Sequence, residues 1–318
     1  MTATTENRSR IVMHLRERLG NGPGGQLDLT PEQIDLAIQR SRQPGIALLR
    51  VPREHRLDGG TTGCRFGGNP TLPAEFDWPT YIAEGGVEMP MQFLLQVDLA
   101  SVPRIDGLPP LPKSGTLFVF YDRILAPHVR EGRHLKDGTA CRVIYSDRVN
   151  ADCAERSIPP IPDLEDFELE PHYSKETSFT RWAFDPVPVE TYPVTGSALP
   201  DACEKRLQDI IGERDDQIAT HLPDGVFKRH LKVSGLHTMF GASQRRYRPD
   251  AETCDLIGLD YDPDELLSDD HILLFSIAED RHIHHEGLLG SGAGFWIKTT
   301  DLADLRFENV VVWADHYA

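Results

Sequence analysis

The sequence has little that would indicate a disulfide framework, a metal site or a membrane segment. Its five cysteines are odd in number and widely spaced, and no Cys-x-x-Cys pair occurs. This usage argues against disulfides and against a thiolate zinc site, and it favours a reducing compartment. The N-terminal residues show no basic-then-apolar signal pattern, and no run approaches the roughly 20 apolar residues of a membrane span. We therefore expect a cytoplasmic protein without a membrane partner.

Basic residues are also scarce, since 33 Lys and Arg stand against 50 Asp and Glu, for a net charge of −17. An acidic surface repels the phosphate backbone, so we expect no nucleic-acid partner. The 318 residues include 39% hydrophobic residues, which is enough for a folded protein with a substantial core rather than a disordered chain.

The usual catalytic motifs are missing. The sequence contains no Gly-x-Ser-x-Gly, no Walker A loop and no His-Glu-x-x-His. The glycine-rich segment 290–294 leads into Phe-Trp-Ile, which is typical of a strand rather than of the helix that a dinucleotide site needs. Cys64 would be a nucleophile only with a histidine close in space. We therefore predict no catalytic residue and no cofactor.

The pattern of apolar residues predicts an α+β fold that is rich in β-structure, with mixed or antiparallel sheets and few helices. Helical periodicity appears at 6–19, in a segment that begins at Thr30, and at 201–221. Apolar runs bounded by Gly, Pro and Asp predict strands, and these runs cover residues 46–51, 91–97, 116–121 and 141–145. The acidic, proline-rich stretch 155–175 predicts a surface loop.

A weak internal echo suggests two related halves. Residues 92–120 and 272–297 each show an apolar strand, a polar loop and a strand led by glycine, and each follows a glycine turn. Any two hairpins of a β-rich protein would also look alike, so both interpretations stay open. On the first, the chain divides into an N-terminal helical segment (1–55), a first half (56–198) and a second half (199–318).

The segment 61–122 carries the most specific pattern in the chain. Its Gly-Gly-x-Pro turn, Trp-Pro pair and two apolar strands resemble the YwqG-like family (DUF1963). The matching residues are Gly67, Gly68, Pro70, Leu72, Pro73, Trp78, Pro79, Phe93, Leu94, Gln96, Val97, Asp98, Leu99, Leu111, Pro112, Gly115, Leu117, Val119, Phe120 and Tyr121. The late strand departs from the family pattern, because Ser276 stands in place of a glutamine. The resemblance implies a fold and no reaction, because the family has no assigned chemistry.

Two groups of residues are candidate sites. A small-ligand site in a cleft between the halves would use Arg65, Gln96, Tyr121, His237 and Gln244. The alternative is that these residues have structural roles. The glycines and prolines would then shape a turn, the glutamine would satisfy buried amides, and the histidine would be a core residue bonded to the backbone. A metal site would use His282, His284 and Glu286, which are suitable ligands for zinc, whereas the alternative there is a solvated loop.

These observations leave three functions open. We expect a non-catalytic binding or interaction protein with an unidentified protein partner or small ligand. The alternatives are a metal-assisted hydrolase at the histidine cluster and a small-ligand receptor with its cleft between the two halves.

Overall fold

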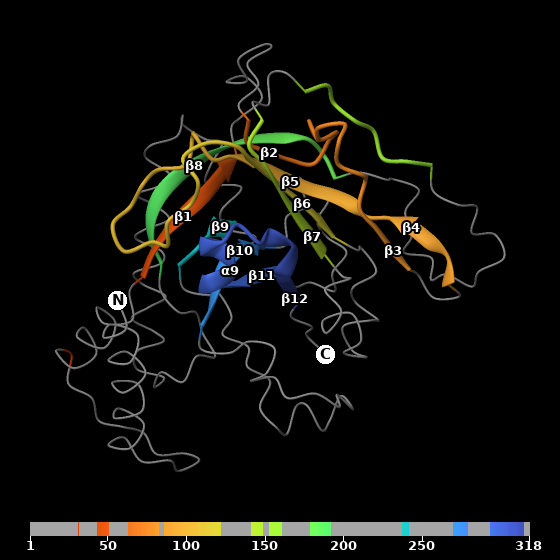
Figure 1. Cartoon of the computed structure of the whole chain (residues 1–318). Coiled ribbons are helices and arrows are strands. Elements are labelled where there is room, and N and C mark those ends of the chain that lie inside the picture. Colours follow the sequence, from red (N-terminus) through yellow and green to blue (C-terminus); the bar gives the residue numbers. More distant parts are fainter. Residues whose placement is uncertain are drawn as a thin grey trace.

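The computed structural model describes residues 43–50, 63–82, 86–121, 141–148, 153–160, 179–191, 237–241, 270–278 and 293–314, together with Pro31. Twelve strands run through these residues (Figure 1). They are β1 (Gln43–Arg50), β2 (Arg65–Phe66), β3 (Thr80–Ile82), β4 (Glu88–Pro90), β5 (Gln92–Asp98), β6 (Thr116–Tyr121), β7 (Cys141–Ser146), β8 (Trp182–Thr191), β9 (Thr238–Met239), β10 (His271–Ile277), β11 (Ala293–Lys298) and β12 (Val311–Ala314). A short helix α9 (Thr299–Ala303) and a 3-10 turn η4 (Phe307–Asn309) lie between β11 and β12.

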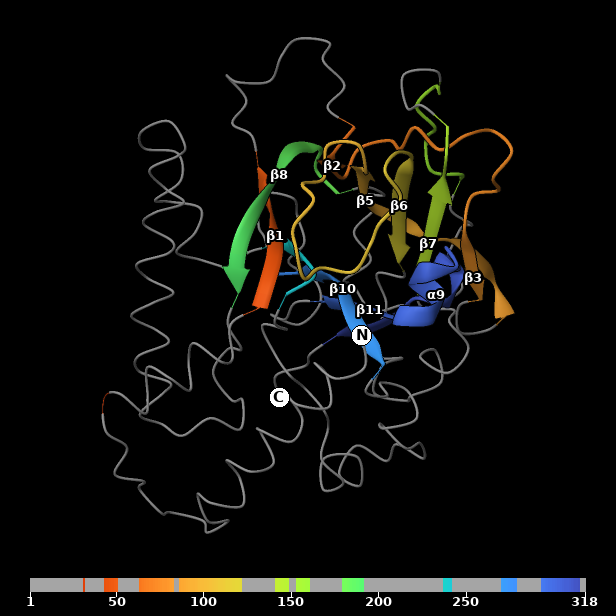
Figure 2. The ribbon, with the colours of Figure 1, turned by 60° about the vertical axis from the view of Figure 1, so that its left-hand side comes forward.

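Ten of the strands form one antiparallel sheet. Its order is β12-β11-β10-β9-β1-β8-β2-β5-β6-β7, and every neighbouring pair in it is antiparallel. At its centre, β1 pairs along its whole length with residues 184–191 of the long strand β8 (Figure 2). On each side of this pair lies a two-residue strand, then a pair of longer strands, then an edge strand.

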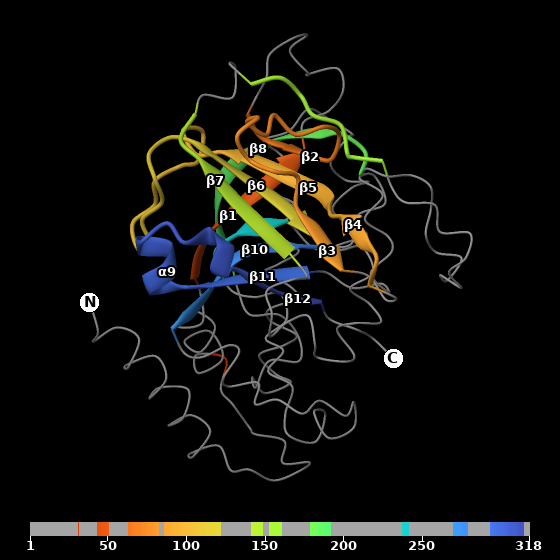
Figure 3. The same ribbon diagram turned by 45° about the vertical axis from the view of Figure 1, so that its right-hand side comes forward.

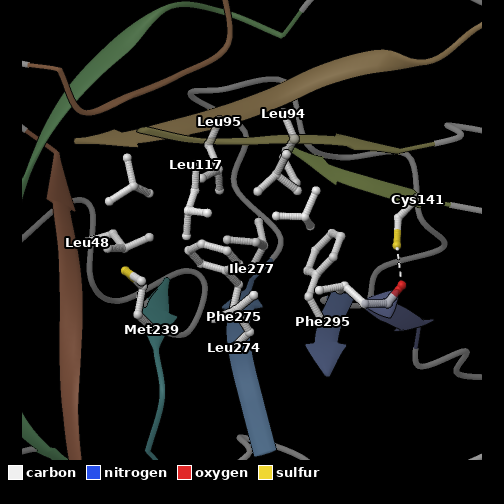
Figure 4. Packing of buried hydrophobic residues seen from close by; sticks show 14 of the residues in the cluster. Leu48, Leu94, Leu95, Leu117, Cys141, Met239, Leu274, Phe275, Ile277 and Phe295 are labelled. Atoms are coloured by element: carbon white, nitrogen blue, oxygen red, sulfur yellow. Dashed lines mark hydrogen bonds between the residues drawn. The ribbon is translucent and has the colours of Figure 1, made fainter. Parts of the chain in front are cut away.

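The sheet curls around a hydrophobic core until its two ends approach each other. Leu94, Leu95 and Leu117 point from β5 and β6 towards β10 and β11, where Phe275 and Phe295 meet them (Figure 4). Beyond these residues, the Cys141 thiol of the edge strand β7 donates a hydrogen bond to the backbone oxygen of Val310, 3.4 Å away and just before β12. The inward faces of both ends therefore enclose one core, and the sheet is nearly closed.

A second, smaller core covers the outer face of β5 and β6. Phe93, Phe118 and Phe120 point outward there, and the β3–β4 hairpin with the loop before it packs over them (Figure 3). Trp78 in this loop is buried, with a residue exposure of 8%. Apolar residues on both faces explain why β5 and β6 appear in the sequence as continuous apolar runs rather than as alternating patterns.

The two sides of the sheet share local details. The register of the β5–β6 pair shifts between Phe93 and Leu95, and that of the β10–β11 pair shifts between Leu273 and Phe275. The short strand beside each pair is also matched, because Phe66 of β2 lies opposite Leu95 and Met239 of β9 lies opposite Phe275.

The residues after the two short strands repeat the same turn. The N–H of Gly67 donates to the oxygen of Leu94 at 2.8 Å, and the N–H of Phe240 donates to that of Leu274 at 3.3 Å. Both turn residues have positive φ, 52° for Gly67 and 57° for Phe240. β2 and β9 therefore hold corresponding positions on the two sides of the β1–β8 pair.

The expected α+β class is wrong. In the described ranges, the helical residues are Pro31, Gly86, the five residues of α9 and the three of η4, whereas twelve strands form the rest of the regular structure. The apolar outer face of β5 and β6 packs against the β3–β4 hairpin and its preceding loop, and the inner face packs mainly against the other end of the same sheet. Strands and loops thus take the place of the helix layer of an α+β fold.

The helical expectation rested on segments that lie outside the described residues. These are 6–19, the remainder of the helix that begins at Thr30, and 201–221. The segment 1–55 contributes β1, which lies at the centre of the sheet between β9 and β8. Within the described ranges, no helix has the length and apolar character needed to span a membrane.

Candidate functional site

Arg65 is a buried arginine on the outer face of the sheet. It lies in β2 opposite Gln96 of β5 and Ala183 of β8. The next residue, Phe66, faces the main core, so alternation along the strand directs Arg65 away from that core. Its residue exposure is only 2%. A charged side chain at this depth needs partners for its five N–H groups, because burial removes the water that would solvate them.

The partners of Arg65 leave part of its guanidinium unsatisfied. Nη2 donates a hydrogen bond to the backbone oxygen of Asn69. The nearest carboxylate oxygen in the described part of the chain is Oε1 of Glu155, 3.7 Å from Nη2, which is beyond hydrogen-bonding distance. Nε is buried and has no hydrogen-bond partner among the residues that the structure describes. A buried donor in this state raises the question of which acceptor would satisfy it.

The Glu155 carboxylate is held mainly by a second arginine. Its Oε1 accepts a hydrogen bond from Nη1 of Arg181 at 2.7 Å. The Glu155 and Arg181 side chains are 37% and 46% exposed, respectively, so this pair lies nearer to solvent than Arg65. Burial, and secondarily the positive charge of Arg181, lower the pKa of the Arg65 guanidinium to about 10, although Glu155 acts in the opposite direction. The site therefore presents a cation that is incompletely neutralised.

The Gly67-Gly68 turn places Arg181 beside Arg65. A Cβ atom on Gly67 would lie 2.3 Å from the oxygen of Phe179, and one on Gly68 would lie 3.0 to 3.1 Å from the Arg181 side chain. The Gly68 N–H donates to the Phe179 oxygen at 2.9 Å. Only glycine permits both the positive φ angles and this close approach. The glycine pair recognised in the sequence thus serves the geometry of the cation site.

The segment that carries Glu155 is anchored by its neighbour, Arg156. The Arg156 N–H donates to the oxygen of Pro70 at 2.9 Å. Its Nη1 donates to the oxygens of Phe76 at 2.6 Å and Pro73 at 3.2 Å. The backbone of the segment is therefore fixed to the loop before β3 by contacts that do not involve the Glu155 side chain.

Gln96 lies next to Arg65 but has a complete set of structural partners. Its Oε1 accepts from the Thr71 N–H at 3.1 Å and from the Thr71 hydroxyl at 3.3 Å. Its Nε2 donates to the oxygen of Gly63 at 3.0 Å. The side chain is fully buried. It ties β5 to the segments on either side of β2, and so fixes the position of Arg65.

Cys64 and His237 precede the matched strands β2 and β9 and perform the same backbone task. The Cys64 sulfur accepts a hydrogen bond from the N–H of Asp98 at 3.3 Å. Nδ1 of His237 accepts one from the N–H of Ala278 at 3.1 Å. Asp98 is the last residue of β5, and Ala278 follows the last residue of β10. Each side chain thus satisfies one backbone donor at the end of a core strand.

The environment of Cys64 disfavours a reactive thiolate. Burial raises the pKa of the Cys64 thiol to about 11, although a hydrogen bond with Ser101, whose Oγ lies 3.0 Å from the sulfur, acts in the opposite direction. The thiol is therefore protonated at neutral pH. Cys64, Cys141 and Cys153 are present as thiols rather than in a disulfide.

The structure places the five candidate ligand-binding residues in different environments. Arg65 and Gln96 are neighbours on the outer face of the sheet. Tyr121 belongs to the main core, where its ring stacks on Phe179 at 5.6 Å. The His237 ring lies 4.7 Å from that of Phe66, on the inner side. Gln244 lies outside the described residues.

The candidate metal ligands His282, His284 and Glu286 also lie outside the described residues. In the part of the chain that the structure describes, no group of three or more His, Cys, Asp or Glu side chains is arranged to hold a metal ion. Sequence reasoning did not identify Glu155 and Arg181. No local motif marks them, because they meet Arg65 only through the folding of the chain.

Comparison with known proteins assigns the chain to a family. The model of a domain of unknown function, DUF1963, matches residues 64–315, and the chain therefore belongs to this family. The resemblance noted in the sequence is confirmed at this level. A comparison with curated proteins returned no match.

Proposed function

We propose that this DUF1963 protein is a non-catalytic binding protein that receives a small anionic ligand at Arg65. The observation that carries the proposal is the buried Nε of Arg65, which lacks a partner while the nearest described carboxylate oxygen lies 3.7 Å from Nη2. Leaving a buried donor unsatisfied costs roughly 1–3 kcal/mol. An anion that accepts a hydrogen bond from this nitrogen would remove the cost and complete the charge balance.

The environment of the site supports recognition rather than turnover. Gln96 positions the strand and has its own partners. The Cys64 thiol, the nearest nucleophilic candidate in sequence, has a pKa raised to about 11 and accepts a backbone hydrogen bond. His237 likewise accepts one. These side chains stabilise the ends of strands, whereas Arg65 has an N–H donor without a partner among the described residues.

The proposal extends to the compartment. Five widely spaced cysteines without a Cys-x-x-Cys pair are typical of a protein from a reducing environment, and this supports a cytoplasmic location. Since the protein carries a net charge of −17, an anionic ligand would need a locally positive site, and the pair of Arg65 and Arg181 provides one.

Binding of small anions tests the function. Acetate, propionate, phosphate and sulfate should be titrated into the protein at constant ionic strength, with calorimetry and thermal melting as readouts. A specific anion should raise the melting temperature and saturate. At a free concentration of about one hundred times its Kd, the anion would stabilise the native state by about 2.7 kcal/mol. If no anion in the panel binds, the proposal is wrong.

Matched arginine variants locate the binding. Arg65→Met removes the charge and retains much of the side-chain volume, and it should abolish binding. Arg65→Lys keeps the charge but loses the planar guanidinium, and it should weaken binding strongly. This variant also provides the test if Arg65→Met does not fold. The control is Arg148→Met, because Arg148 pairs with Glu75 at the surface and its side chain is 60% exposed. Equal loss in Arg148→Met and the Arg65 variants would show non-specific attraction.

A further inference from the structure

We infer that Glu155 is an internal carboxylate that occupies the Arg65 site until a carboxylate-bearing ligand displaces it. The inference rests on the proposed function and adds to it the chemical class of the ligand and a means of regulating access. It begins from the position of the Glu155 side chain, which lies between the exposed guanidinium of Arg181 and the buried guanidinium of Arg65.

The contact between Glu155 and Arg65 is loose. Its 3.7 Å separation is an ion pair without a hydrogen bond, whereas the same oxygen lies 2.7 Å from Arg181. The Glu155 side chain is 37% exposed, so water can solvate its charge when it moves. The exposed Glu155–Arg181 pair contributes little to stability. Loss of the Glu155 charge beside the buried Arg65 would be costly by itself, but a ligand carboxylate that takes its place restores the counter-charge, so the exchange costs little.

The backbone allows this movement without unfolding. The Arg156 N–H and guanidinium are bonded to the oxygens of Pro70, Pro73 and Phe76. Asn69 Nδ2 lies 3.4 Å from Ser157 Oγ and donates to it. These contacts fix the backbone of the two residues that follow Glu155. A rotation about the side-chain bonds of Glu155 therefore moves its carboxylate away from Arg65 without moving this anchored backbone.

The geometry of the guanidinium favours a carboxylate as the ligand. Nε and Nη2 lie on one edge of the planar group, and Nε is the donor that has no partner. A planar carboxylate can accept from both nitrogens of such an edge. The nearest described carboxylate oxygen, that of Glu155, lies 3.7 Å from Nη2. Propionate reproduces the end of the Glu155 side chain and is therefore the probe for the site.

Two substitutions at position 155 distinguish direct competition between Glu155 and the ligand from a long-range effect of the Glu155 charge. Glu155→Gln removes the carboxylate. Glu155→Asp keeps the charge but shortens the side chain by one methylene, so the carboxylate reaches Arg65 less well. If Glu155 competes with the ligand, both variants should bind propionate more tightly than the native protein, by about fivefold for Glu155→Gln. If only long-range charge matters, Glu155→Asp should bind as the native protein does.

The matched control is Glu75→Gln, which removes a carboxylate from the exposed Arg148 pair and should leave the affinity for propionate unchanged. Unchanged affinity in both Glu155 variants would overturn the inference while the proposed function stands, provided that the native protein binds an anion. Absence of any anion binding in the native protein and in both variants would overturn the proposed function as well. Tighter binding of phosphate than of propionate would overturn the assignment of the ligand class.

Discussion

Replacing Trp78 by alanine tests the second core and the loop that it holds. The Trp78 ring packs edge-on against Phe120, with ring centroids 5.2 Å apart. Its Nε1–H donates to the oxygen of Met91 at 2.8 Å, and the Met91 N–H donates to the oxygen of Pro79 at 2.8 Å. One side chain thus joins the loop to the residue that precedes β5.

The expected loss follows from this burial. Deleting a buried tryptophan side chain costs about 3–5 kcal/mol, which is a large part of the roughly 5–15 kcal/mol that stabilises a typical protein. Trp78→Phe keeps an aromatic ring but removes the donor to the Met91 oxygen, and it should cost about 1–3 kcal/mol. The difference between the two variants separates packing from hydrogen bonding.

Urea unfolding followed by far-UV circular dichroism measures both losses. With a slope of about 2–3 kcal/mol per molar urea, Trp78→Ala should lower the midpoint by about 1–2.5 M. Ile82→Ala is the control, because Ile82 lies in the same hairpin region and is 57% exposed; its effect should stay within about 0.5 kcal/mol. An unchanged midpoint in Trp78→Ala, or equal losses in Trp78→Ala and Ile82→Ala, would refute the reasoning.

Two further predictions concern the turn glycine and the buried thiols. Gly67→Ala should destabilise the protein far more than Gly86→Ala, because the new Cβ would lie 2.3 Å from a backbone oxygen at position 67 and would contact nothing within 4 Å at position 86. Both glycines have positive φ, so alanine at either position costs about 1–2 kcal/mol in backbone strain. Equal unfolding free energies of the two variants in urea would contradict this prediction. Burial raises the pKa of Cys64 to about 11 and that of Cys141 to about 12, from 9.0. Since the unfolded thiols ionise first, their contribution to stability is complete below pH 9 and is lost as the pH rises through about 11 and 12. Unfolding free energies should fall as the pH rises above about 9, less steeply in Cys64→Ala, and a flat profile there would contradict the assignment.

The longer core strands were predictable from the sequence, and β8 was not. β5, β6 and β7 follow the expected segments closely, because uninterrupted apolar runs bounded by turn residues indicate buried strands. β8 contains Pro186 and Pro188, which normally argue against a central strand. Its pairing explains the exception, because β2 pairs only with Trp182 and Ala183. Beyond these residues β8 has no second neighbour among the described strands, and proline is tolerated there.

The site was only half predictable for a related reason. Arg65 and Gln96 are conspicuous because they adjoin the glycine turn and an apolar strand. Glu155 lies in a stretch that predicts a solvated acidic loop, and Arg181 immediately precedes the unpredicted strand β8. Their meeting with Arg65 depends on the register of β2 with β5 and β8. Long-range register of this kind leaves no local pattern in a single sequence.

The matched positions of Cys64 and His237 show why residue type alone is a poor guide to chemistry in this fold. Each position is defined by a backbone N–H at the end of a core strand, Asp98 in one case and Ala278 in the other. The backbone oxygens of the two residues also make matching contacts: the Cys64 oxygen accepts from the N–H of Phe184 at 3.3 Å, and the His237 oxygen accepts from that of Leu48 at 2.8 Å. A thiol and an imidazole both meet the requirement for a buried acceptor. Their presence therefore follows from the need to satisfy a strand end. Arg65 carries a charge and a buried Nε without a hydrogen-bond partner among the described residues, and it is therefore the better candidate for the proposed binding site.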